Sequence, residues 1–206
     1  MRVVRGIVVA VILIILAVPL GSTASAASKD QVKRGGYLVT IGGCNDCHTP
    51  WIFNKALNMP VPDFSRALSG HPSNAPDPIG TVGKGDIGLI GPTFTSFKMP
   101  FGIVYSANLT PDQETGLGSW READFIRALR TGKHFGGNGR AILPPMPWME
   151  IGQMTDADLK AIFAYLRTLK PIRNAVPDPK IPEEAIHAIT ESFEKMKGQM
   201  LAAPAR

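Results

Sequence analysis

The stretch Cys44-Asn45-Asp46-Cys47-His48 holds the only two cysteines among the 206 residues of the chain. A histidine follows the second cysteine directly, and Cys-x-x-Cys-His is the attachment pattern of a c-type haem. In that pattern the two thiols add to the vinyl groups of the porphyrin, and the adjacent imidazole binds the iron. The sequence therefore predicts one covalent haem c, attached at Cys44 and Cys47 with its iron bound by His48.

Three other roles for the cysteine pair stay open at this point. A thioredoxin-like redox pair requires a βαβ context, whereas Gly42-Gly43 stands where the strand would end. A zinc site needs four ligands, and His71 and His134 could complete such a set, although the spacing matches no common zinc pattern. A disulfide across two residues closes too small a loop to stabilise the chain much. Haem attachment is the favoured interpretation.

The sixth iron ligand is predicted to be Met146, within Pro144-Pro145-Met146-Pro147-Trp148. Prolines fix φ and remove backbone donors, so they can hold a flexible thioether in a rigid loop. A thioether opposite histidine raises the potential of the iron and closes the site for electron transfer. His71 and His134 are expected in loops or at the surface, with bis-histidine ligation as a minority alternative. The competing methionines are Met99, beside Pro100, and then Met59, Met149 and Met154.

Residues 1–26 are predicted to be a signal peptide. Arg2 and Arg5 precede an apolar run at 6–18, and Ala24-Ser25-Ala26 supplies a small-x-small cleavage site. Such a run is short for the hydrocarbon core of a membrane, although an uncleaved signal-anchor that tethers the protein is the alternative. Cleavage near Ala26 predicts a periplasmic protein that is soluble or peripherally bound to the membrane.

The charge balance predicts no nucleic-acid partner. Without Arg2 and Arg5 the chain carries 20 basic and 17 acidic residues, and it has no long basic run. Any steering toward a protein partner would therefore come from local patches.

Three helices are predicted around the motif, at about 29–41, 119–130 and 155–169. Glycines 42 and 43 end the first helix, and capping boxes open the other two. Between them, 18 of the 69 residues at 50–118 are Gly or Pro, which predicts a long irregular insertion instead of helix. We therefore expect an all-α fold with this insertion wrapped around a prosthetic group. The two capping boxes are Ser119 with Glu122, and Thr155 with Asp158.

Residues 173–206 are predicted to form a linker and an amphipathic C-terminal helix. Apolar residues recur between Glu183 and Leu201 at alternating spacings of three and four, as on one face of a helix. Such a face packs on its own domain or, as the alternative, docks to a partner subunit. The apolar residues are Ile186, Ile189, Phe193, Met196 and Met200.

These features together resemble a class I cytochrome c, over about Lys29–Ile172, and place the cytochrome c domain at 27–172. The resemblance implies that the first and last helices of the domain cross closely, at Gly36-Tyr37 and Tyr165-Leu166. A glycine at such a crossing permits close approach of the two backbones.

The chain is most similar to the cytochrome c domains in the cytochrome subunits of bacterial membrane-bound alcohol and sugar-acid dehydrogenases. Those subunits carry several Cys-x-x-Cys-His sites, whereas this chain has one. The resemblance further implies positions near the haem or its propionates for Asn108, Trp120 and Arg140. Similar stretches are found here at 105–112, 116–120 and 143–148.

The expected function is that of a periplasmic electron carrier and not of an enzyme, although the chain could also be a subunit of an oxidoreductase complex. One haem ligated by His48 and Met146 would carry single electrons from a dehydrogenase to the respiratory chain, through an oxidase or another cytochrome. The alternative is a haem enzyme or gas sensor whose sixth coordination position is open.

Overall fold

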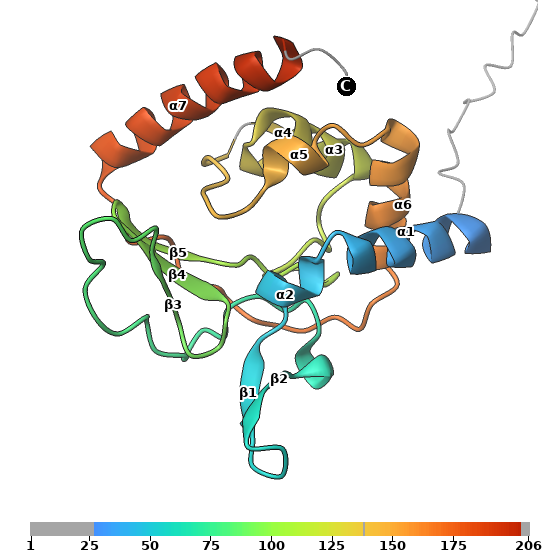
Figure 1. Cartoon of the computed structure of the whole chain (residues 1–206). Helices are drawn as coiled ribbons and strands as arrows, with labels where there is room; N and C mark the ends of the chain where they lie inside the picture. Colours follow the sequence, from blue (N-terminus) through green and yellow to red (C-terminus); the bar gives the residue numbers. More distant parts are fainter. Residues whose placement is uncertain (1–26, 138, 203–206) are drawn as a thin grey trace, which may run out of the picture.

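Helix α1 (Lys29–Ile41) crosses helix α6 (Asp156–Leu166), and the main core forms around this pair (Figure 1). The computed structural model describes residues 27–137 and 139–202, so the signal peptide predicted at 1–26 lies outside the described residues. Ser28 caps α1 by accepting a hydrogen bond from the Gln31 amide at 3.1 Å. The limits predicted for the first helix are therefore confirmed.

The closest approach of α1 and α6 is at Gly35. A Cβ on Gly35 would clash with the carbonyl of Ala161, whereas a Cβ on Gly36 would meet only the ring of Tyr165, at 3.0 Å. Tyr37 is 56% exposed and faces away from the crossing. The crossing partner implied by the resemblance is thus present at Tyr165, but the tightest contact lies one residue before Gly36.

Gly35→Ala is expected to lower the free energy of unfolding by about 3 kcal/mol, because the new methyl group must displace the backbone of α6. Gly36→Ala is the matched control, since its neighbour is a ring that can shift and alanine favours the helix. Denaturant unfolding of the haem-loaded proteins measures both values. Equal unfolding midpoints for the two variants would contradict the placement of the closest contact between α1 and α6 at Gly35.

The second and third predicted helices differ from their expected limits. Helix α3 (Glu122–Thr131) begins after Arg121, whose amide donates to the Asp124 carboxylate at 3.2 Å, so the capping box predicted at Ser119 is wrong. The side chain of Arg167 donates to the carbonyls of residues 117 and 118 at 3.0 and 2.6 Å, which holds the chain in a turn before the helix. In α6 the predicted cap is confirmed, with Thr155 Oγ1 accepting from the Asp158 amide at 3.1 Å, but the helix ends at Leu166.

Short antiparallel strands occupy the region that was predicted to be irregular, so the fold is not all-α. Strands β1 (Trp51–Asn54) and β2 (Met59–Pro62) form a hairpin that projects from the body (Figure 1). A second sheet pairs β3 (Leu89–Ile90), β4 (Ser96–Met99) and β5 (Gly102–Tyr105). Glycines and prolines exclude helix here but still permit two- to four-residue extended segments between turns. A 3₁₀ turn, η1 (Phe64–Arg66), separates the two sheets.

Three short helices complete the helical part of the fold. They are α2 (Cys44–His48), α4 (His134–Gly137) and α5 (Trp148–Ile151). A second core cluster joins the sheet to the loop before α5, through Phe97, Val104 and Leu143. The haem-attachment pattern therefore lies between a helical core and a small β-sheet core.

The C-terminal region packs on the domain that precedes it. In the predicted linker, Asn174 is buried and donates to the carbonyls of Ser69 and His71 at 2.7 and 2.8 Å. Helix α7 (Glu183–Ala202) then crosses the side of the molecule formed by α4 and α5 (Figure 1). The predicted amphipathic helix is confirmed, although the Met200 side chain lies outside those described. Among the described residues, none of the helices combines the length and the apolar character needed to cross a membrane.

Candidate functional site

His48 is buried at the end of α2 with one ring nitrogen already bonded. Its Nδ1 donates to the carbonyl of Ala107 at 2.8 Å, and this bond fixes the tautomer in which Nε2 carries the free lone pair. Burial lowers the pKa of His48, so the ring is neutral near neutral pH. A neutral, oriented imidazole with a free Nε2 is the form that binds iron.

The insertion between the motif and α3 holds His48 in place. The amide of Gly70 donates to the His48 carbonyl at 2.8 Å. Gly70 has a φ of +75°, and a Cβ there would collide with the backbone of Ser106 and Ala107. The insertion therefore supplies both Ala107, which orients the imidazole, and the glycine that packs against it. Sequence patterns do not reveal Ala107, because its backbone carbonyl makes the contact.

Cys44 and Cys47 are free, half-buried thiols on the single turn of α2. Gly43, with a φ of +64°, makes the turn that separates α2 from α1. Burial raises the pKa of Cys44 to about 11 and also raises the pKa of Cys47, with a further contribution from Asp46. Cys44 packs against the main core and Cys47 against the sheet core. Both thiols are therefore neutral and lie in largely apolar surroundings, where a porphyrin edge can be attached.

Met146 is half-buried in a loop whose backbone is internally bonded. Its amide donates to the Leu143 carbonyl at 3.2 Å, and its carbonyl accepts from the Trp148 amide at 2.9 Å. Met146 packs against the main core, as Cys44 does. Met99 packs against the sheet core, as Cys47 does, with its sulfur lying against Gly88. Both methionines thus lie in clusters that contain an attachment cysteine.

The weaker methionine candidates have other surroundings. Met59 is 51% exposed on β2. Met149 and Met154 pack partly buried against the main core, on α5 and just after it.

His71 lies in a loop, as predicted, but its side chain is fully buried and not at the surface. Its Nδ1 lies 2.9 Å from Thr95 Oγ1, and its ring lies 4.8 Å from that of Tyr105. His134 is half-buried beside Trp120, with ring centroids 6.2 Å apart. Within residues 27–137 and 139–202 no three or more His, Cys, Asp or Glu gather into a metal-binding group. The structure does not bring the four residues of the zinc alternative together.

The stability of the fold is expected to fall in mild acid because of His134. Burial, followed by the neighbouring Arg140 cation, lowers the pKa of His134 from 6.5 to about 4. Between these values the unfolded chain binds a proton that the folded chain does not, so stability falls as the pH drops through this window. From pH 7 to pH 5 the loss is about 2 kcal/mol. Urea unfolding at both pH values should show that the His134→Gln protein lacks this loss of unfolding free energy. The same pH dependence in the variant and the wild type would contradict the role of His134.

Asn108, implied by the resemblance to lie near the haem, is buried in a polar network of its own. Its amide donates to the Ile172 carbonyl at 2.8 Å and to Thr115 Oγ1 at 3.2 Å. Its oxygen accepts from the amide and hydroxyl of Thr110 at 3.0 and 2.7 Å. Asn108 therefore ties the segment before α3 to the segment after α6.

Trp120 and Arg140, the other two residues implied by the resemblance, lie near the α4 turn. The Trp120 ring lies 5.0 Å from that of Phe135. Arg140 is exposed, and its Nη1 donates to the neighbouring Ala141 carbonyl at 3.4 Å.

The donor set at α2 fits a c-type haem. It combines a neutral imidazole with one free nitrogen, two uncharged thiols on one helical turn and thioethers in both adjoining clusters. Soft sulfur and imidazole donors suit iron in a closed, low-dielectric site.

Several known proteins similar to this chain are cytochrome c subunits of dehydrogenases, although no family model matches it. It is 31% identical over 175 residues to the cytochrome c subunit of gluconate 2-dehydrogenase from Pantoea cypripedii, covering 82% of this chain and 31% of the relative. It is 30% identical over 172 residues to the cytochrome c subunit of quinone-dependent alcohol dehydrogenase from Gluconobacter oxydans, covering 82% and 28%. The resemblance to the cytochrome c domains of such subunits is therefore confirmed.

A further relative is a subunit of the nicotinate dehydrogenase from Pseudomonas putida. It is 33% identical over 150 residues, which covers 73% of this chain and 10% of the relative. The chain spans about a third or less of the length of all three of these relatives.

Proposed function

We propose that the protein is a periplasmic c-type cytochrome that carries single electrons on one haem, attached at Cys44 and Cys47 and ligated by His48 and Met146. The observation that carries the proposal is the bond from His48 Nδ1 to the Ala107 carbonyl, which leaves Nε2 for iron. When bound, haem supplies a one-electron ferrous–ferric couple.

The residues of the chain would hold, orient and shield that group. The Ala107 carbonyl keeps the imidazole in the ligand tautomer. The soft thioether of Met146 favours ferrous iron and so raises the potential. The sheet core formed by Phe97, Val104 and Leu143 excludes water on the side of Cys47. With His48 and Met146 both bound to the iron, the chain would transfer electrons without binding a substrate there.

A dehydrogenase is the proposed electron donor, and an oxidase or another cytochrome the proposed acceptor. The names of the relatives support the donor, since several are cytochrome subunits of dehydrogenases. Export with cleavage near Ala26 would place the protein in the periplasm, with any membrane association peripheral or through its partner.

Carbon monoxide binding by the reduced protein tests the closed site. At neutral pH the spectrum of the reduced protein should not change on addition of carbon monoxide, because Met146 occupies the sixth position. A potentiometric titration on the same sample should follow a one-electron Nernst curve. Ready carbon monoxide binding would instead support a haem enzyme or gas sensor with an open position.

A further inference from the structure

The loop at 144–148, which holds Met146, is called the methionine loop below. Helix α7 contacts it through Phe193, the buried member of the described α7 side chains. The Phe193 ring meets Trp148 edge-on, with centroids 5.6 Å apart. Trp148 is 3% exposed, and its amide donates to the Met146 carbonyl at 2.9 Å. Phe193 of α7 therefore contacts the residue that bonds directly to Met146, the proposed ligand.

A second residue of α7 fixes the same tryptophan. Lys197 Nζ donates to the Arg130 carbonyl at 2.8 Å and lies 5.9 Å from the centre of the Trp148 ring. The carboxyl end of α3 favours a cation, because its carbonyls point outward there. Gly132 follows this end, and a Cβ on it would clash with the indole. Trp148 therefore packs between the carboxyl end of α3 and helix α7.

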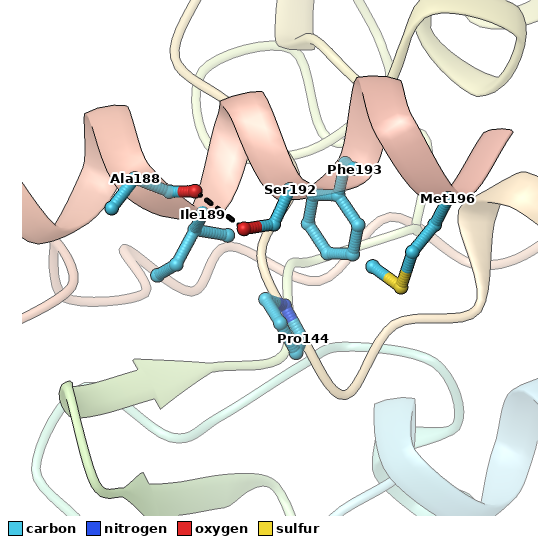
Figure 2. Close-up of a pocket in the computed structure, with 6 residues that line it drawn as sticks. All are labelled: Pro144, Ala188, Ile189, Ser192, Phe193 and Met196. Carbon is cyan, nitrogen blue, oxygen red and sulfur yellow. Dashed lines mark hydrogen bonds between the residues drawn. The ribbon is translucent and has the colours of Figure 1, made fainter. Parts of the chain in front are cut away.

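The remainder of the contact between α7 and the loop is loosely packed. Figure 2 shows Pro144 facing a row of α7 side chains across an apolar hollow of about 250 Å³. The hollow is open to solvent, since Ser192 and Met196 at its edge are exposed, so α7 packs less closely on Pro144 than on Trp148. Among the contacts of α7 with the loop, the one at Trp148 is therefore the closest to Met146. The α7 residues that line the hollow are Ala188, Ile189, Ser192, Phe193 and Met196.

We propose that Phe193 and Lys197 are positioning residues that hold Trp148, and through it Met146, in the ligand-bound arrangement. This inference rests on the proposed ligation by Met146. Helix α7 thereby restrains the methionine loop. The strength of its contact with Trp148 sets how readily Met146 is released from the iron.

Imidazole competition in the full-length, haem-loaded ferric protein measures this role. Added imidazole displaces a thioether, so its apparent affinity rises with the fraction of molecules in which Met146 is released. Phe193→Ala is expected to raise that affinity about tenfold, and Lys197→Gln about threefold. Phe193→Leu and the exposed control Glu191→Ala should both stay near wild type.

Two results separate this inference from the proposed ligation. A folded Phe193→Ala protein with wild-type imidazole affinity, together with an unchanged Lys197→Gln protein, overturns the positioning role. An iron–thioether band that persists in Met146→Ala overturns the ligation instead. Hydrogen exchange at the Met146 and Trp148 amides then decides the role of α7 independently. Faster exchange in Phe193→Ala supports restraint of the methionine loop by α7, and unchanged exchange contradicts it.

Discussion

The Met146→Ala protein is expected to lose the iron–thioether absorption band of its ferric form and to bind carbon monoxide when reduced. Removing the sulfur opens one axial position, because alanine has no donor to replace it. The potential should fall by on the order of 0.1 V or more, since the thioether favours ferrous iron. Optical spectra and potentiometry on the purified protein measure these changes.

Met99→Ala is the matched control for this experiment. Met99 packs against the same sheet core as Cys47, yet its sulfur lies against Gly88 within the insertion. The band and the potential should therefore survive this substitution, with only a loss of stability of about 1 kcal/mol, because the truncated side chain is partly buried. A band that disappears in Met99→Ala and persists in Met146→Ala would reverse the ligand assignment.

A Cys44→Ser, Cys47→Ser double variant is expected to contain no covalent haem. Hydroxyl groups do not form the thioether bonds, so the mass of the exported chain should equal that of the polypeptide alone. The free energy of unfolding should fall by about 4 kcal/mol or more, because the packing of the haem and its ligation by Met146, which form only in the folded state, are lost. Mass spectrometry and thermal unfolding measure the two effects.

Asp46→Asn serves as the control for the cysteine pair. It changes an exposed residue of the same helical turn and leaves both thiols in place. This variant should keep one covalent haem per chain. A double serine variant that retained covalently bound pigment would contradict attachment at α2.

Helix limits that depend on local capping could be predicted well from the sequence. Ser28 and Thr155 cap their helices as expected, because an N-cap side chain bonds to an amide only two or three residues away. The start of α3 could not be predicted in this way, since Arg167, far along the chain, holds the carbonyls at 117 and 118. Long-range contacts of this kind leave no local pattern.

The insertion could be predicted only as non-helical. Its strands are two to four residues long, too short for an alternating pattern to stand out. The burial of His71 depends on Thr95 and Tyr105, which the chain brings together only when the second sheet forms. The orienting contact to His48 uses the backbone of Ala107, so no residue type marks it.

In the candidate site, too, some features follow from local sequence patterns and others depend on long-range contacts. The proposed attachment pair and iron-binding histidine follow from residue types at a fixed spacing, and the proposed methionine ligand follows from the prolines around it. The apolar stripe of α7 predicted an amphipathic helix, but such a stripe looks the same whether it packs inside its own chain or on a partner. The Phe193–Trp148 contact shows that the stripe packs on its own domain.

The methyl resonances of methionine provide the most direct test of a single haem closed by His48 and Met146. The chain has eight methionines, of which all but Met1 remain after cleavage near Ala26, and labelling their methyl groups with ¹³C makes each visible in the reduced protein. The account predicts that one methyl signal is shifted far upfield by the porphyrin ring current and is missing from the Met146→Leu spectrum. A spectrum with no shifted methyl, or one whose shifted signal disappears in Met99→Leu, would contradict it.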